Sequence, residues 1–261
     1  SRNEKQGRTG FAHLFEHLMF GGSQNVGKGE HFALISENGG SFNGTTSQDR
    51  TVYYATVPAN QSDLALFLES DRMARLDVTQ ENMDIEREVV KEERRQRVDN
   101  MPYGSMYEVS LQTFFNSFAY RHSVIGSMED LNSATIEDAR EFYRTYYAPN
   151  NAVLVLVGDF DVKAATRKIE QYFGPIPSQP APPPLNADEP LFVGERRETI
   201  TDNQANLPRF RRYYRTVRGD HPDFHALQVL ATILTGRGKT GRLYQPIVES
   251  KVALSISAIQ L

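Results

Sequence analysis

The stretch FAHLFEHLMF, residues 11–20, is the segment that most constrains the fold predicted from the sequence. Seven of its ten residues are apolar, yet His13, Glu16 and His17 lie among them. At about 100° per residue of an α-helix, the two histidines lie about 40° apart on neighbouring turns, with the glutamate on their flank. The pattern therefore predicts a helix with one buried apolar face and a narrow polar face, ended by the glycine pair that follows.

This polar face has the residue types of a metal site. Two imidazoles one turn apart can bind one Zn²⁺, and a carboxylate beside them can reach metal-bound water. The pattern is H-x-x-E-H, the reverse of the metallopeptidase motif H-E-x-x-H. The alternative is a core helix with two hydrogen-bonded histidines. With six histidines in the chain, composition alone would produce the pattern on the order of once per hundred such chains.

Zinc bound by two histidines needs a third protein ligand, with the fourth position left to water. The chain has no cysteine, so the acidic segment ENMDIEREVVKEERRQRVDN, residues 81–100, is the place to look. Four of its residues have the spacing of a buried helical stripe: Glu86, Val89, Val90 and Glu93. A buried carboxylate must be paired or metal-bound. We expect Glu93 to be the ligand and Glu86 to support a ligand histidine, whereas Glu88 and Glu92 point elsewhere.

Composition limits the other possibilities. The chain of 261 residues is long enough for one or two domains, and 39% hydrophobic with 24% charged residues is typical of a globular protein. A net charge of −4 argues against nucleic-acid binding. The longest apolar run, residues 152–157, is too short to span a membrane. Because the chain starts on charged residues without a methionine and ends on a strand-like segment, we expect a piece of a longer protein.

The order of predicted elements indicates an α+β fold, with layered helices on a mostly antiparallel sheet. Strands are expected at 51–58 and 151–160. Helices are expected at 11–20, within 29–40, at 62–76, 79–98, 104–117, 135–148 and 162–173, and further along the chain within 223–236 and 241–250. Residues 174–190 hold seven of the thirteen prolines and predict a semi-rigid spacer. We therefore expect a first domain at 1–175, a linker at 176–190 and a partial second α+β domain at 191–261, with strand-like pieces within 196–217 and at 253–261.

Several stretches resemble one family. HLFEH, followed 76 residues later by Glu93 within EREVVKEE, resembles the inverzincin peptidases related to pitrilysin and the mitochondrial processing peptidase. GGSFNGTTSQDRTVYYATV, residues 39–57, resembles the Ser-x-Asn-Ala-x-Thr edge strand of that family, with Gly44 in place of alanine. Residues 135–159 resemble the close of its first domain, and residues 233–250 resemble the middle of its second. The resemblance covers nearly the whole chain and implies two related domains of the processing-peptidase type, both incomplete here.

The resemblance also implies roles for particular residues. Zinc would be bound by His13, His17 and Glu93. Glu16 would be the general base, and Glu86 would support the site. An extended peptide would pair with the strand around Phe42, Asn43 and Gly44.

Family members are clamshells whose far half supplies an arginine and a tyrosine to the substrate carbonyl, in some bacterial members from a separate subunit. Where many relatives have Leu-Ala-Tyr, this chain has Ala253, Leu254 and Ser255. We therefore expect a partner, either a second subunit or a C-terminal half. The remaining histidines, among them His31 and His122, are expected to be ordinary loop or helix residues.

The sequence thus predicts a zinc-dependent endopeptidase that hydrolyses extended peptides or unfolded polypeptides with metal-activated water and a glutamate base. The alternative is a non-catalytic scaffold or assembly subunit on the same fold. For the compartment, the bacterial periplasm is expected ahead of the mitochondrial matrix.

Overall fold

The computed structural model describes residues 1–185, 187–190, 194–236 and 238–260. The chain forms two compact units, Ser1–Arg209 and Phe210–Leu261. The parts of the predicted linker, second domain and C-terminal strand that fall on residues 186, 191–193, 237 and 261 lie outside the described residues. The domain boundary expected at 176–190 stays a prediction.

The first unit is built mainly of helices. They are α1 (Phe11–Leu18), α2 (Glu30–Glu37), α3 (Ser62–Arg75), α4 (Gln80–Arg94), α5 (Met106–Phe114), α6 (Phe118–Arg121), α7 (Met128–Ser133), α8 (Ile136–Tyr146) and α9 (Val162–Phe173). Shorter turns are the 3₁₀ segments η1 (Ala59–Gln61) and η3 (Pro149–Asn151), and the π-helical segment η2 (Arg95–Asp99), which continues α4. Among the described residues, no helix combines the length and the apolar character that crossing a lipid bilayer requires.

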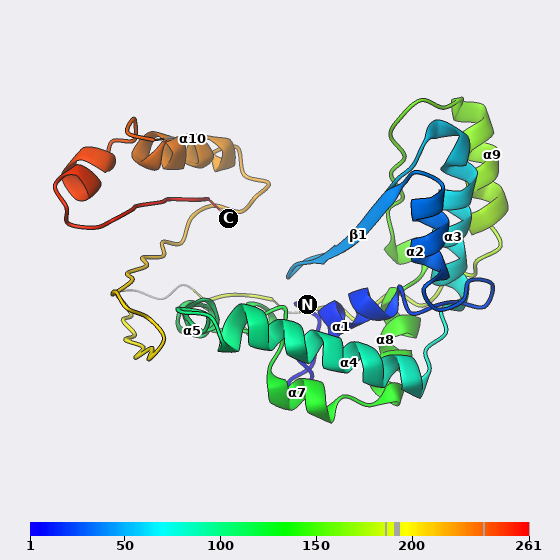
Figure 1. Cartoon of the computed structure of the whole chain (residues 1–261), viewed down its shortest axis with the longest axis horizontal. Coiled ribbons are helices and arrows are strands. Elements are labelled where there is room, and N and C mark those ends of the chain that lie inside the picture. The colour runs from blue at the N-terminus through cyan, green and yellow to red at the C-terminus, as the bar shows by residue number, and fades with distance from the viewer. Residues whose placement is uncertain (186, 191–193, 237, 261) are drawn as a thin grey trace. The chain divides into compact units, whose positions relative to one another are not determined.

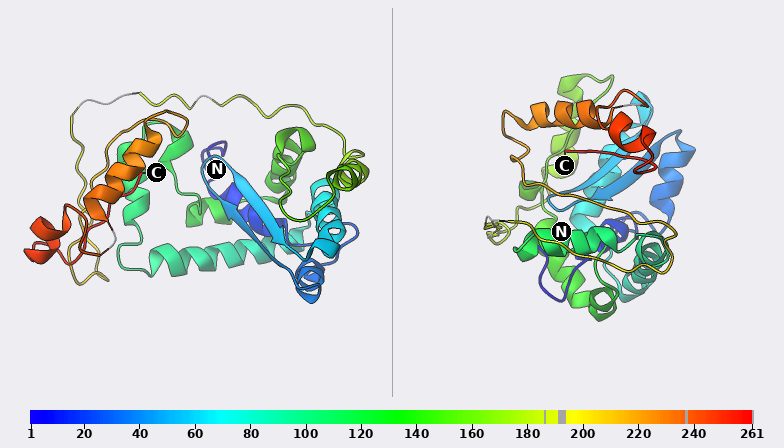
Figure 2. Two further views of the ribbon diagram at one scale, coloured as in Figure 1. Left: turned by 90° about the horizontal axis from the view of Figure 1, so that it is seen from above. Right: turned by 90° about the vertical axis from the view of Figure 1, so that its left-hand side faces the viewer.

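The sheet formed by the described residues is one antiparallel hairpin of β1 (Ser41–Thr46) and β2 (Thr51–Thr56) (Figures 1 and 2). Ser41 lies opposite Thr56, and Thr46 lies opposite Thr51. The β-branched and aromatic residues of β2 suit a pleated surface that is half buried. Helices packed on an antiparallel sheet confirm the predicted α+β class.

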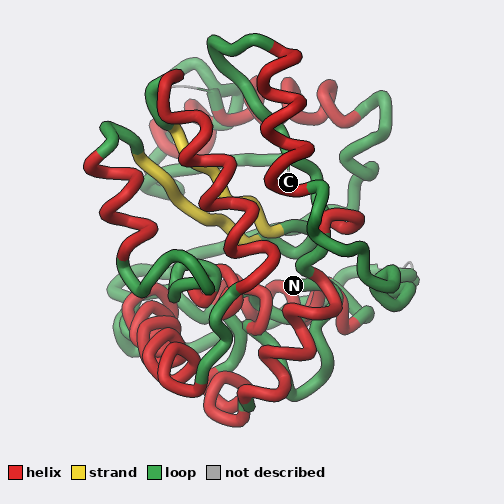
Figure 3. Tube along the Cα trace, turned by 90° about the vertical axis from the view of Figure 1, so that its right-hand side faces the viewer, coloured by secondary structure: helices red, strands yellow, loops and turns green. Residues whose placement is uncertain are grey.

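Two hydrophobic clusters hold the first unit together. One joins α1, α4, α7 and α8 through Phe11, Leu14, Phe15, Leu18, Met83, Val90, Leu131 and Ala139. The other cluster lies between α2, α3 and the hairpin, and Figure 3 shows the hairpin behind the helices. In this cluster Val26, Ile35 and Leu68 pack against Phe42, Ala55 and Val57. Helix α1 therefore belongs to the first cluster, and it also contacts β1.

The strand predicted at 151–160 is wrong for the described structure. Residues 152–157 form no strand, and Val153 and Val157 are 89% and 88% exposed. A strand needs a neighbour for its ladder of hydrogen bonds, and none of the described residues pairs with this segment.

The second unit contains α10 (Phe224–Thr235) and the π-helical segment η4 (Tyr244–Glu249). None of the residues of α10 is buried, and Val229, Leu230 and Ile233 are exposed. The strand-like pieces predicted within 196–217 and at 253–261 are not strands in the described residues. The predicted helices of this region are present, the second as a short π-helical turn.

Candidate metal centre

Helix α1 separates its apolar and polar residues as the sequence predicts. Phe11, Ala12, Leu14, Phe15 and Leu18 are buried. The same helix presents His13, Glu16 and His17 on its other side, where each is only partly buried. The three polar groups in this core-like segment therefore avoid the apolar core by facing a shared site.

Helix α4 brings the acidic residues to that site. Its Met83 and Val90 are fully buried in the cluster that contains α1, so the helix packs directly against α1. On the adjoining side, Glu86 and Glu93 have side chains that are only 18% and 16% exposed. The predicted stripe is wrong at Val89, which is 45% exposed and faces an open cavity.

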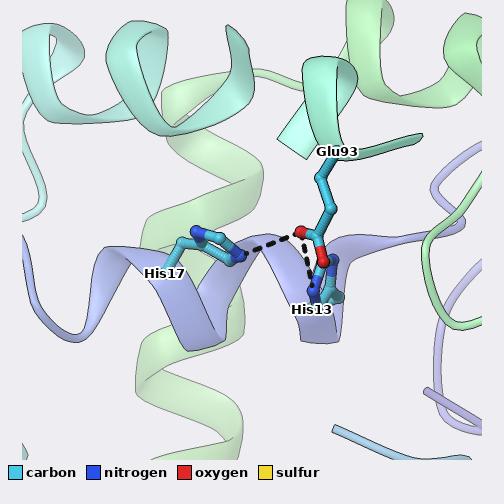
Figure 4. A group of neighbouring side chains, drawn as sticks. All are labelled: His13, His17 and Glu93. Carbon is cyan, nitrogen blue, oxygen red and sulfur yellow. Dashed lines mark ion pairs between the residues drawn. The ribbon is translucent and has the colours of Figure 1, made fainter. Parts of the chain in front are cut away.

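The structure brings the predicted ligand set together (Figure 4). Glu93 Oε2 lies 3.4 Å from Nε2 of His13 and 3.4 Å from Nε2 of His17. Ligand atoms of the three residues lie within 4.8 Å of one another. Glu86 Oε2 lies 3.5 Å from Nδ1 of His17, on the other side of the ring. Arg97 pairs with the second oxygen of Glu93, which leaves one oxygen of Glu93 directed at the histidines.

These distances fit a shared zinc ion better than direct ion pairs. Charge-assisted N–H···O contacts are about 2.7–2.9 Å long, shorter than the 3.4 Å found here. Around zinc with ligands at about 2.0–2.1 Å, the edge of a regular tetrahedron is about 3.3–3.4 Å. Two imidazoles and one carboxylate are also the donor set of known catalytic zinc sites. The residues present therefore fit zinc.

The electrostatics of the three ligands differ. Burial lowers the pKa of His13 to about 4, so this ring is neutral and free to bind a metal at neutral pH. For His17 burial also opposes the charged ring, but the nearby carboxylates of Glu86 and Glu93 outweigh it and raise the pKa to about 9. The proximity of His17 in turn lowers the pKa of Glu93. Metal binding would therefore release a proton, mainly from His17.

Glu16 lies beside the ligands and against strand β1. Its Oε2 accepts a hydrogen bond from the hydroxyl of Thr46. A Cβ atom on Gly44 would lie only 2.8 Å from Cγ of Glu16, so the glycine leaves room for this side chain. Burial raises the pKa of Glu16, and the bond from Thr46 opposes that rise. The sequence did not single out Thr46, although it ends the Ser-x-Asn-Ala-x-Thr pattern.

Strand β1 forms one wall of the site. Phe42 packs on the ring of Phe20 at 5.0 Å, and Gly44 is buried beside Glu16. Asn43 is exposed, and its Oδ1 accepts a hydrogen bond from the Gly44 N–H at 2.8 Å. Among the described residues β1 pairs with β2 alone, so its other edge is available to a further strand.

An open cavity of about 1430 Å³ joins these parts. It is lined by His13, Glu16, His17, Glu93, residues 43–46 of β1, and Ile85, Glu88, Val89 and Glu92 of α4. Glu88 and Glu92 also line this cavity with side chains that are 62% and 54% exposed, and neither belongs to the group His13, His17 and Glu93 that could hold a metal ion.

Two family models match consecutive parts of the chain. The model described as "Insulinase (Peptidase family M16)" matches residues 1–127, and the model described as "Peptidase M16 inactive domain" matches residues 133–260. All the predicted site residues lie in the first of these ranges.

Curated relatives and a solved structure are also similar. The chain is 32% identical over 253 residues to "Zinc protease PqqE" of Helicobacter pylori, covering 96% of this chain and 57% of that protein. It is 25% identical over 267 residues to a probable mitochondrial-processing peptidase subunit beta of Arabidopsis thaliana, covering 99% of this chain and 50% of that protein. The crystal structure of a protease from Helicobacter pylori matches with a TM-score of 0.86 and 30% identity, covering 96% of this chain and 60% of that chain. The chain thus spans between 50% and 60% of the length of these relatives.

Proposed function

Since the chain belongs to the M16 family of zinc metallopeptidases related to pitrilysin and the mitochondrial processing peptidases, we propose that it is the zinc-binding part of an endopeptidase. The observation that carries this proposal is the spacing of His13, His17 and Glu93, whose contacts of 3.4 Å match the edges of a zinc tetrahedron. The substrate class is an extended peptide or an unfolded polypeptide.

Each residue of the site has a distinct task in peptide hydrolysis. His13, His17 and Glu93 would hold a zinc ion, whose Lewis acidity would polarise the scissile carbonyl and lower the pKa of a water molecule. Glu16 takes the proton of the attacking water and passes it to the leaving amine nitrogen. Glu86 holds His17 through Nδ1, which leaves Nε2 of that ring directed at Glu93.

Strand β1 is proposed to hold the substrate. The edge of β1 beside the cavity can pair with an extended peptide through main-chain hydrogen bonds. Phe42, Asn43 and Gly44 are the residues we assign to this contact. The Asn43 side chain accepts the Gly44 N–H at 2.8 Å, so it must turn aside if a peptide carbonyl takes that donor.

The rest of the active enzyme lies outside this chain in our proposal. The cavity is open, and the chain spans about 57% of the PqqE relative. A second half, on the same polypeptide or on a partner subunit, would close the cavity and supply an arginine and a tyrosine. The periplasm stays our expectation for the compartment, and fractionation of cells that express the full-length protein tests it.

One observation favours the scaffold alternative. The family model that matches residues 133–260 is described as an inactive domain. The complete set of His13, Glu16, His17 and Glu93 lies outside that range and favours an enzyme.

The test compares the full-length protein, with its partner half present, with its Glu16→Gln variant. We expect the wild type to bind about one zinc per chain and to cleave an internally quenched extended peptide until a chelator is added. The variant should keep its zinc and lose on the order of 10²–10⁴-fold in kcat. Zinc binding without cleavage would support the scaffold alternative, and full turnover by the variant would remove Glu16 from its role.

A further inference from the structure

Helix α1 begins without a cap of its own. Its N-cap residue, Gly10, makes no side-chain capping bond, and the first turn contains no acidic residue. The first N–H groups of a helix need acceptors from elsewhere. Glu4 supplies them, because its carboxylate accepts from the N–H of Gly10 at 3.0 Å and of Ala12 at 2.7 Å. A negative charge at this end of the helix is also favourable for the helix dipole.

The carboxylate of Glu4 is completely buried and paired with a histidine. Nε2 of His122 lies 2.9 Å from Glu4 Oε2, and its Nδ1 lies 2.8 Å from the carbonyl oxygen of Phe118. With Glu4 ionised both partners are acceptors only, and the ring that satisfies both carries a proton on each nitrogen and is a cation. The His122 side chain is 10% exposed and its ring stacks on that of Phe118 at 4.7 Å. The expected ordinary loop histidine is thus half of a buried ion pair.

The segment that follows, residues 122–127, also reaches α4. The carbonyl oxygen of Gly126 accepts a hydrogen bond from Nη1 of Arg94 at 2.5 Å, and Arg94 directly follows Glu93. The same glycine lies against the start of α1, since a Cβ on it would lie 2.4 Å from the carbonyl oxygen of Thr9 and 2.6 Å from Cα of Gly10. Its φ of +77° suits glycine alone.

One short segment therefore touches both helices that carry the ligand set. We propose that residues 122–127 fix α1 relative to α4, through the Glu4–His122 ion pair at one end and the Arg94–Gly126 hydrogen bond at the other, and so set the metal affinity of the site. This inference rests on the proposed zinc site. It assigns positioning roles to Glu4, His122 and Arg94, which are not themselves ligands.

The geometry explains why such a support matters. Helix α1 has only eight residues, and His13 is the third of them, in the turn that Glu4 caps. A metal site must be held to within about 0.5 Å of its working geometry. If the first turn of α1 loosens, His13 moves relative to His17 and to Glu93 on the other helix.

The test measures zinc affinity in the full-length protein by competition with a chromophoric chelator. We expect His122→Leu and Glu4→Gln to weaken zinc binding by about tenfold, the lower end of the effect of mutations that disturb ligand support. His122→Gln keeps a donor towards Glu4 without the charge and should weaken binding by less. The matched control is Lys5→Gln, which breaks the exposed Lys5–Glu141 pair of 2.9 Å one residue after Glu4 and should leave zinc affinity unchanged.

Circular dichroism of the metal-free variants shows whether weaker zinc binding comes from misplaced ligands in a folded protein or from loss of the fold. Zinc affinity equal to wild type in folded His122→Leu, even with a lower Tm, would overturn the inference. If that variant does not fold, the same comparison is made with Glu4→Gln, for which about tenfold weaker binding is also expected, and unchanged affinity there has the same meaning. Failure of the proposed function is recognised separately, as a wild-type protein that binds no zinc or binds it equally well after His13→Gln.

Discussion

The Thr46→Val variant tests whether strand β1 positions the proposed general base. Thr46 Oγ1 has one proton, and it is donated to Glu16. Thr51 Oγ1, 3.3 Å from Thr46 Oγ1, must therefore be the donor in the contact between the two hydroxyls. Valine keeps the shape and the β-branch of threonine, so the hairpin is preserved while the donor to Glu16 is lost.

The size of the effect follows from the surroundings of the carboxylate. A hydrogen bond to a charged group is worth about 1.5–3 kcal/mol. Because Glu16 borders an open cavity, water can partly replace the hydroxyl, and the low end applies. About 1.5 kcal/mol corresponds to about a tenfold smaller population of correctly placed carboxylate. We expect kcat to fall about tenfold, with KM and zinc content unchanged.

Steady-state kinetics on an internally quenched peptide, with zinc measured on the same samples, checks this expectation. Thr46→Ser should recover most of the lost kcat because it restores the hydroxyl. Thr56→Val, an exposed position of β2, is the control for replacing a threonine of the hairpin by valine. A kcat within twofold of wild type in Thr46→Val, or a loss explained entirely by missing zinc, would refute the reasoning.

Three further predictions concern the same region. Glu93→Gln should lose zinc, whereas Glu92→Gln, whose side chain is 54% exposed, should keep it; metal analysis of both decides. Gly44→Val, whose side chain is larger than the alanine of the family pattern, should lower kcat, because its Cβ alone would meet Cγ of Glu16 at 2.8 Å and displace that side chain; unaltered kinetics would contradict this. Burial opposes the charge on His122, but its hydrogen bond with a carboxylate raises the pKa overall. The stability from that pair is therefore fully present below the ordinary histidine pKa of about 6.5 and is lost as pH rises through the raised value. The Tm advantage of wild type over His122→Leu should therefore shrink as pH rises above about 6.5.

Local patterns in the sequence predicted most helices. The start of α8 illustrates this, because Thr135 and Asp138 form the capping box that their spacing indicates. The apolar run at 152–157 was misjudged for a different reason. Its β-propensity is real, but a strand exists only with a partner, and pairing depends on segments far away in the sequence.

The candidate site was likewise predictable where local patterns determine it and unpredictable where distant segments meet. Helical periodicity was enough to place His13 and His17 on one face, and the cost of burying a charge pointed to Glu93 on another helix. The periodicity failed at Val89, because a helix that borders a cavity has an apolar residue facing open space. The contact between Glu4 and residue 122 joins positions 118 apart, and no local pattern predicts such a contact.

Helix α1 carries both core residues and site residues, and this has a consequence for the dynamics of the protein. Leu14 and Phe15 are fully buried, and they lie in sequence between the two histidines of the site. The middle of the helix therefore cannot open without exposing the core, so the amide hydrogens of Leu14 and Phe15 should exchange only when the whole first unit opens. At a zinc concentration about 100 times its Kd, this opening would become about a hundredfold rarer. Amides far from the cavity, in α7 or α8, would then report metal binding through slower hydrogen–deuterium exchange.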